Sequence, residues 1–364
     1  MADGPRVPAA PRVGWLKGFG AGWLASVPQR SFAPGHKRRD AREPGTATPH
    51  ARTSGRNSMS FRHDGSMTAL VTGASGTVGS ALVRRLVDDG ERPVLAGRDL
   101  EGLRERWPSL EARRFDALEG ASLAGLLDGI DALYYLIHSM QEGSAGFGER
   151  DRRAAENLAR AASDAGVGRI VYLGGLGEDD QELSEHLSSR HETGNVLARF
   201  GPPVLELRAA MVVGRGSASF RMLSDLVDRL PAMVLPKWVD TPSQPIAIDD
   251  VIAYLAAAGH VPIGPGHTVV EIGGADVVTY RQMLQTYAKL RGKRRLLLGV
   301  PFLTPRLSSL WCTLVTSVDN NVARPLIDGM VNPTVVRGDD ASTLFPQIEP
   351  VGFAEAMRRA IAGR

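Results

Sequence analysis

Cysteine is nearly absent from this chain of 364 residues, which contains only Cys312. A single cysteine excludes an intrachain disulfide and suits a reducing compartment such as the cytoplasm. No apolar run reaches the roughly 18–20 residues that a membrane-spanning helix needs. The eight histidines are scattered, and neither a His-x3-His nor a paired-cysteine spacing occurs, so the sequence predicts no metal site.

Acidic residues are scarce in the first part of the chain. Residues 1–66 contain eleven Lys/Arg and four Asp/Glu, a net charge of +7, so the total of +3 leaves −4 for residues 67–364. The basic character therefore belongs to this leader, and the remainder shows no sign of a nucleic-acid surface.

The leader is rich in Pro, Gly, Ala and Arg and has no helix or strand period, so we expect it to be disordered. Three explanations stay open. The leader is an extension ahead of a natural start at Met67, a targeting peptide, or a basic tail for an anionic partner, centred on residues 37–39.

A glycine-rich turn between an apolar run and an amphipathic pattern is the most informative stretch. The run 68–72 leads into Gly73-x-x-Gly76-x-x-Gly79. The first glycine permits a tight turn, the second lets the backbone approach a pyrophosphate, and the third lets a helix pack closely on the strand. Because a helix N-terminus attracts anions, we expect a dinucleotide to bind here. The candidate binding residues of this turn are Gly73, Ser75, Gly76, Thr77, Val78 and Gly79.

From Met67 the sequence alternates apolar runs with helical periods. Most of the runs are continuous, which is typical of strands buried on both faces of a parallel sheet. The expected strands are 69–72, 93–97, 112–115, 132–137, 169–174 and 204–213. The expected helices between them are 77–89, 122–127, 149–165 and 184–200. This order predicts an α/β fold with a doubly wound parallel sheet, the Rossmann fold.

After Gly214 the pattern loosens, and we expect a smaller α+β lobe. Its expected helices are 220–230, 249–258, 279–290 with Thr279 as N-cap, 320–330 and 353–362, and its short strands are 245–248 and 268–272. The expected division is a leader at 1–66, a Rossmann domain at 67–260 and a C-terminal lobe for substrate or partner at 261–364, interleaved with 214–245.

The apolar stretch 296–318 has two interpretations. It is a helix that closes the lobe, or it is a surface for a hydrophobic substrate such as a quinone or lipid, or for a membrane. The basic residues Arg291, Lys293, Arg294 and Arg295 precede it.

Four motifs together resemble the extended-type short-chain dehydrogenases/reductases. They are the glycine turn, Tyr134-Tyr-Leu-Ile-His138-Ser139, Arg208-Ala-Ala-Met-Val-Val-Gly214 and Pro245-Ile-Ala-Ile-Asp249-Asp250-Val-Ile. The chain is most similar to the atypical, NmrA-like NAD(P)H-binding branch, which is related to the branch of the Rossmann-fold accessory subunit of respiratory complex I. The resemblance covers roughly residues 67–290 and implies a bound NAD(P)(H).

The resemblance also implies further cofactor contacts. Arg98 stands where an NAD-specific protein has Asp or Glu, and an arginine suits the 2′-phosphate of NADP(H), although Asp99 follows it. We therefore expect NADP(H) to be preferred over NAD(H). Asp116 occupies the place of an acidic residue near the adenine, or it serves as a turn or cap residue.

The nicotinamide half of the cofactor would lie near two further strand ends. Ile137 and His138 follow the fourth strand, where His138 is placed to touch the ribose or a substrate carbonyl. Val212, with its neighbours, would flank the nicotinamide.

The sequence departs from the family at its catalytic residues. Active members have a Ser or Thr at the end of the fifth strand and Tyr-x-x-x-Lys on the next helix. Here the strand ends Tyr172-Leu-Gly-Gly, and the aligned helix reads His186-Leu-Ser-Ser-Arg190. Arg190 can bind a ribose but cannot relay a proton, because it stays charged. His186 and His138 remain candidate acid–base groups, and Tyr172 is expected in the core.

Two functions follow from this departure. The missing hydroxyls favour an NAD(P)(H)-binding protein that acts as a redox sensor or as an assembly partner. The apolar lobe favours an NAD(P)H-dependent oxidoreductase for a hydrophobic carbonyl or quinone, since a quinone can take its proton from solvent. A nucleotide-sugar epimerase or dehydratase is a weaker alternative, because that chemistry depends on the missing tyrosine.

Overall fold

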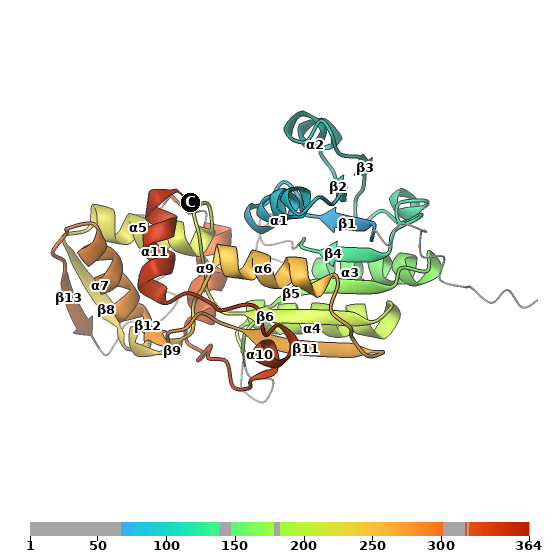
Figure 1. The fold of residues 1–364 in the computed structure, drawn as a ribbon. Helices are drawn as coiled ribbons and strands as arrows, with labels where there is room; N and C mark the ends of the chain where they lie inside the picture. The colour runs from blue at the N-terminus through green and yellow to red at the C-terminus, as the bar shows by residue number, and fades with distance from the viewer. Residues whose placement is uncertain (1–66, 138–146, 178–182, 301–316, 319, 364) are drawn as a thin grey trace, which may run out of the picture. The chain divides into compact units, whose positions relative to one another are not determined.

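The computed structural model describes residues 67–137, 147–177, 183–300, 317–318 and 320–363 (Figure 1). The leader and His138, for which the sequence led to predictions, lie outside these residues.

A seven-stranded parallel sheet organises most of the described chain (Figure 1). The order of its strands is β11-β6-β5-β4-β1-β2-β3, and every neighbouring pair is parallel. The strands are β1 (Ala69–Thr72), β2 (Val94–Gly97), β3 (Ala112–Arg114), β4 (Ala132–Tyr135), β5 (Arg169–Gly175), β6 (Val204–Ala209) and β11 (His267–Ile272). The chain runs outward from β1 in both directions, so the topological switch point, where such folds bind ligands, lies between β1 and β4.

Helices cover both faces of this sheet. Alternate side chains of the strands contact α1 and α6 on one face, and α3 and α4 on the other. Most sheet residues are apolar on both faces, and β1, β4 and β6 are buried along their whole length. Burial of the strands on both faces of the sheet therefore explains the continuous apolar runs of the sequence, as we expected. These helices are α1 (Thr77–Asp88), α3 (Phe147–Asp164), α4 (Glu185–Phe200) and α6 (Ile248–Ala258), and α2 (Leu100–Arg106) follows β2.

A second hydrophobic core is built mainly from elements that follow β7 (Val212–Val213) in the chain. Its helices are α5 (Ala218–Arg229), α7 (Tyr280–Leu290), α9 (Asn320–Gly329) and α11 (Phe353–Ala362), and a two-stranded parallel sheet of β8 (Ala232–Pro236) and β13 (Leu296–Val300) packs on them. The remaining elements are β7 (Val212–Val213), β9 (Pro242–Ser243), β10 (Ile246–Ala247), β12 (Val278–Thr279), α10 (Asp340–Leu344) and the 3-10 helices η1 (Gly120–Leu123) and η3 (Lys237–Asp240).

The expected cap of α7 is confirmed. The hydroxyl of Thr279 accepts a hydrogen bond from the backbone N–H of Gln282 at 3.2 Å, and the side chain of Gln282 accepts one from the N–H of Thr279 at 2.7 Å. This reciprocal pair satisfies two of the amide groups that a helix start leaves without intrahelical partners. It fixes the first residue of the helix, Tyr280, which matters for the site described below.

Several expectations for secondary structure were wrong. The run 204–213 is two strands, because β7 leaves the main sheet and pairs with β10. The segment 122–127 is not an α-helix, and only the short η1 forms there. Residues 296–300 form β13 rather than the start of a helix, because they pair with β8, which the sequence analysis did not anticipate. Residues 301–316 of that expected helix lie outside the described chain.

The strand β11 extends the main sheet beside β6, although its residues fall in the segment 261–364 that we expected to form the lobe. In the described part of the chain, no helix is long and apolar enough to cross a membrane.

Candidate functional site

The glycine turn between β1 and α1 has the geometry of an anion cradle. Gly73 has a φ of +66°, and a β-carbon there would lie 2.5 Å from the carbonyl oxygen of Leu136. A β-carbon on Gly79 would overlap the carbonyl group of Gly73. The N–H of Gly76 donates to that same carbonyl at 2.9 Å, which closes the turn. Gly73 is thus required by a left-handed backbone and a close approach, and Gly79 by a close approach alone.

The start of α1 is suited to an anion. Its N-cap is Gly76, which offers no side-chain oxygen to the first amide groups of the helix. A β-carbon on Gly76 would meet only the oxygen of Gly73, at 3.2 Å, so its other sides are open. A phosphate group fits that open space, where the helix N-terminus favours negative charge. The residues present therefore fit the pyrophosphate of a dinucleotide.

A first cavity of about 260 Å³ extends from this turn along the ends of β1, β2 and β4. It brings together six of the residues that the sequence singled out, although they come from four separate segments. These are Gly73, Ser75, Gly76, Arg98 and Asp116, with Ile137 beside them on the strand end.

Arg98 and Asp99 have different surroundings. Both are exposed and line the first cavity. The carboxylate of Asp99 caps α2, since it accepts a hydrogen bond from the N–H of Gly102 at 3.0 Å. The acidic residue that argued against NADP(H) is thus engaged in starting a helix.

Asp116 takes part in a turn as well as lining the cavity. Its carboxylate accepts a hydrogen bond from the N–H of Leu118 at 2.9 Å. The hydroxyl of Ser122 donates to the Asp116 carbonyl at 2.7 Å. The turn role that we considered is therefore present, and it holds the residue at the cavity wall.

A second cavity, of about 620 Å³, begins at the same turn and extends to residues of the second core. The two cavities share Gly73, Ser75, Gly76 and Leu136, so the glycine turn lies where they meet. The apolar lining comes mainly from the end of β5, from α9 with the residue that follows it, and from the segment after β6. Its members are Leu173, Leu176, Leu187, Met211, Val212, Val322, Leu326 and Met330. The side chains with polar groups are Thr77, His186, Arg190, Ser217, Ser219, Arg221, Tyr280 and Thr334.

His186 and Arg190 lie one turn apart on α4, and both line the second cavity. The guanidinium of Arg190 donates to the carbonyl of Leu173 and lies over the ring of Tyr172, 5.2 Å from its centre. Arg190 is therefore held against the end of β5, where it lines the second cavity.

Packing accounts for the glycines at the end of β5. A β-carbon on Gly174 would overlap the carboxylate of Glu206, a fully buried residue that pairs with Arg208 at 2.9 Å and with His267 at 2.8 Å. A β-carbon on Gly175 would lie 2.9 Å from the side chain of Leu187. The buried ion pair thus leaves no room for a side chain at position 174, whereas at position 175 only the flexible end of Leu187 stands in the way.

Tyr172 is a core residue, as we expected. It is fully buried in β5, and its hydroxyl donates to the carbonyl of Arg190 at 3.0 Å. Burial raises its pKa well above the ordinary value.

The sequence analysis missed Tyr280. This residue begins α7, is 9% exposed and lines the second cavity together with Thr334. Burial raises the pKa of Tyr280 to about 12, although the neighbouring hydroxyls of Ser243 and Thr334 act to lower it. Those two hydroxyls are themselves linked, because Thr334 donates to Ser243 at 2.8 Å. The sequence signal that could have identified Tyr280 is its position directly after the N-cap of a helix in the lobe.

Comparisons with known proteins agree with this geometry. A family described as NAD(P)H-binding matches residues 73–200. The ceramide reductase of Caulobacter vibrioides is 27% identical over 238 residues, which are 64% of this chain and 73% of that protein. The (4-alkanoyl-5-oxo-2,5-dihydrofuran-3-yl)methyl phosphate reductase of Streptomyces griseus is 25% identical over 62% of this chain and 74% of its own length.

Among solved structures, the NADPH-dependent quinone oxidoreductase of Escherichia coli, in complex with NADPH, has a TM-score of 0.64. It is 20% identical, and the match covers 80% of this chain and 99% of that one, so it supports the fold. The matches do not confirm the complex I branch. They do support the wider resemblance: residues 73–200 are similar to a family of NAD(P)H-binding proteins, and the chain shares the Rossmann fold of the solved oxidoreductase.

Proposed function

We propose that this protein is an NADPH-dependent reductase of a hydrophobic carbonyl or quinone substrate. The observation that carries the proposal is the second cavity, which runs without a break from the glycine turn to the apolar residues Val322, Leu326 and Met330. A cofactor seated on the turn would share this cavity with an apolar substrate. Two relatives are named as reductases, of a ceramide and of an alkanoyl-substituted phosphate, and these names support a reductase that acts on molecules with apolar chains.

The chain's own residues would hold the cofactor along the ends of the parallel strands. The amide groups at the start of α1 would bind the pyrophosphate, Arg98 the 2′-phosphate, and Asp116 the adenine side of the nucleoside. Arg190 would bind the nicotinamide ribose, and Val212 would flank the nicotinamide. Ile137, which lines the first cavity, would contact the cofactor there. When bound, NADPH supplies the hydride that the reaction needs.

The proton would come from Tyr280. Carbonyl reduction needs a hydride at the carbon and a proton at the oxygen, and it yields an alcohol and NADP⁺. With a pKa raised to about 12, the phenol of Tyr280 stays protonated at neutral pH and can donate to a substrate oxygen. The adjacent hydroxyls of Ser243 and Thr334 would stabilise the phenolate that is left. His186, on the same cavity, is the second candidate donor.

One observation favours the alternative of a redox sensor. The end of β5, where active relatives place a hydroxyl, carries two glycines, and the guanidinium of Arg190 is engaged by the Leu173 carbonyl. A sensor would bind the cofactor without turning a substrate over.

The test uses the full chain with NADPH and a panel of aliphatic aldehydes and ketones of increasing chain length, together with short-chain quinones. We expect NADPH oxidation that improves with chain length. Tyr280→Phe should lower kcat about 100-fold with little change in KM, since general acids contribute about 10²–10⁴-fold.

The matched control is Tyr287→Phe. This tyrosine also lies buried on α7, but it bonds Asp228 and is not among the residues that line the second cavity. Its rate should stay within about twofold of the unchanged protein, because no catalytic contact is lost. NADPH binding without oxidation across the whole panel would reject the reductase in favour of the sensor.

A further inference from the structure

The two-stranded sheet of β8 and β13 has one buried and one exposed apolar face. Met233, Leu235 and Leu297 face the second core. Val234, Leu296 and Leu298 point outward, with 47%, 57% and 48% of their surface exposed. In the described part of the chain only six large apolar side chains are exposed, by 38% to 57%, and three of them lie on this sheet.

The strand register places these outward residues next to one another. Leu298 pairs with Val234, and Leu296 pairs with Ala232, which is also exposed. The exposed face is therefore a continuous apolar surface, which we call the β8–β13 face, made of Ala232, Val234, Leu296 and Leu298. A contiguous apolar patch of this kind marks an interaction site more often than scattered apolar residues do.

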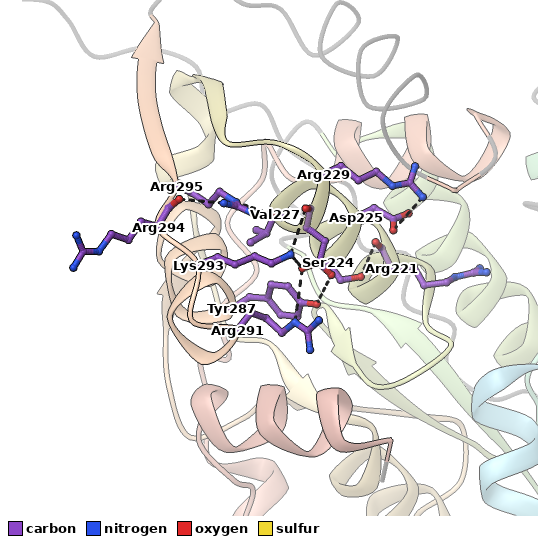
Figure 2. A network of polar contacts seen from close by, with 11 residues as sticks. Arg221, Ser224, Asp225, Val227, Arg229, Tyr287, Arg291, Lys293, Arg294 and Arg295 are labelled. Carbon is purple, nitrogen blue, oxygen red and sulfur yellow. Dashed lines mark hydrogen bonds and ion pairs between the residues drawn. The ribbon is translucent and has the colours of Figure 1, made fainter.

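Basic residues border this face at the start of β13. Between residues 277 and 300 the chain has six Lys/Arg and no Asp/Glu. Within that stretch, the turn between α7 and β13 contributes Arg291, Lys293, Arg294 and Arg295. Figure 2 shows that Arg294 points away from the polar network that its neighbours form.

That network fixes the basic turn to α5. Asp228 accepts hydrogen bonds from Lys293 at 2.5 Å and from Tyr287 at 3.0 Å, and Arg291 lies 3.7 Å away (Figure 2). Arg295 donates to the carbonyl of Val227 at 2.6 Å. One carboxylate is thus shared by two cations, and the border of the β8–β13 face keeps a positive charge in a fixed position.

We propose that the β8–β13 face docks on an anionic lipid bilayer. A rigid apolar surface bordered by Lys and Arg matches the interface of such a bilayer, where apolar side chains enter the acyl boundary and cations meet the headgroups. An acidic protein surface without an apolar patch would pair with the cations but would leave the exposed leucines in water. This inference is independent of the proposed reductase activity, because it rests on a different face of the second core.

The first test is the sedimentation of the full chain with phosphatidylcholine vesicles, with and without one third phosphatidylglycerol. We expect binding that requires the anionic lipid and weakens as salt is added, because screening shortens the reach of the charges. The double substitution Leu296→Ser with Leu298→Ser, and separately Arg291→Gln with Arg294→Gln, should each weaken binding about tenfold.

The matched controls are Val87→Ser and Arg104→Gln, which alter exposed residues on α1 and α2. They should bind as the unchanged protein does. Equal binding to neutral vesicles, or unchanged binding by both double variants, would overturn the proposal. The second result would assign the affinity to another part of the chain, such as the basic leader.

A second measurement reports on the face directly. In a Cys312→Ser chain, an environment-sensitive dye is attached to Val234→Cys or, as a control, to Val87→Cys. We expect a blue shift on anionic vesicles for the label at 234 and none for the label at 87. No shift at 234 on vesicles that bind the protein would overturn the proposal. A shift at 234 without vesicles, accompanied by dimerisation, would also overturn it, because the face would then join two copies.

Discussion

Gly79 at the first turn of α1 packs directly on the carbonyl group of Gly73, so that a β-carbon at position 79 would lie 2.7 Å from the carbonyl carbon and overlap its oxygen. The neighbouring Gly76 differs, because its β-carbon would meet the same oxygen at 3.2 Å and otherwise point into open space. Substitutions at the two positions therefore distinguish what the fold requires, at Gly79, from what the ligand requires, at Gly76.

We predict that Gly79→Ala destabilises the protein by about 2 kcal/mol, as overpacking of backbone on backbone does. Gly76→Ala should leave the unfolding temperature nearly unchanged but abolish cofactor binding, because the methyl group fills the phosphate cradle. Thermal unfolding and NADPH fluorescence titration measure the two effects. If Gly76→Ala bound NADPH normally, the turn would not be the phosphate site.

Arg98 should decide the choice between the two cofactors. Arg98→Glu removes a cation that would meet the 2′-phosphate and adds a repulsive charge, so NADPH affinity should fall about tenfold or more. NADH affinity should change little, and Arg104→Glu, an exposed residue of α2 outside the cavity, should change neither. Equal losses for both cofactors after Arg98→Glu would contradict a 2′-phosphate contact.

Asp228 should give the stability of the lobe a pH dependence. Partial burial alone would raise its pKa, but the hydrogen bonds from Lys293 and Tyr287 hold it below the ordinary value. The folded chain thus holds this proton more weakly than the unfolded chain. The ionised form stabilises the fold above the ordinary carboxyl range, and this contribution is lost as the pH falls through about 4 and below.

The corresponding substitution is Asp228→Asn, which should cost about 1 kcal/mol at neutral pH, since the side chain is about one-third exposed. Unfolding in urea at several pH values measures it, with exposed Asp88→Asn as the control. The difference between Asp228→Asn and the unchanged protein should disappear near pH 3. A difference that persists there would have to come from packing rather than from charge.

The two glycines at the end of β5 should respond differently to a serine. Gly174→Ser meets the buried carboxylate of Glu206, whose position is fixed by Arg208 and His267, so it should destabilise the fold by about 2–3 kcal/mol. Gly175→Ser meets only the end of the flexible Leu187 side chain, and it should cost less than about 1 kcal/mol. Similar losses at both positions would show that Glu206 is not the obstacle.

The sequence was sufficient for the elements whose residues carry a local signal. Continuous apolar runs predicted most strands of the central sheet, and Thr279 marked the start of α7. Gly73 and Gly79 were identified because a close backbone approach leaves no alternative to glycine.

The parts that the sequence could not reveal depend on long-range pairing. Residues 296–300 form a short apolar run, and such a run occurs both in helices and in buried strands. They form a strand because they pair with β8, which is distant in the sequence. Tyr280 and Thr334 come together in the cavity although they are 54 positions apart by their residue numbers. Such a meeting has no local signature, so the candidate proton donor became visible only with the fold.

The most direct test of the reductase proposal is hydride transfer itself. NADPH deuterated at C4 of the nicotinamide is incubated with the full chain and a long-chain aliphatic ketone, and the product is analysed by mass spectrometry. The proposal predicts an alcohol that carries one deuterium at the former carbonyl carbon, formed in a one-to-one ratio with NADP⁺. Tight NADPH binding without labelled alcohol from any ketone, and without oxidation by any quinone, would contradict it.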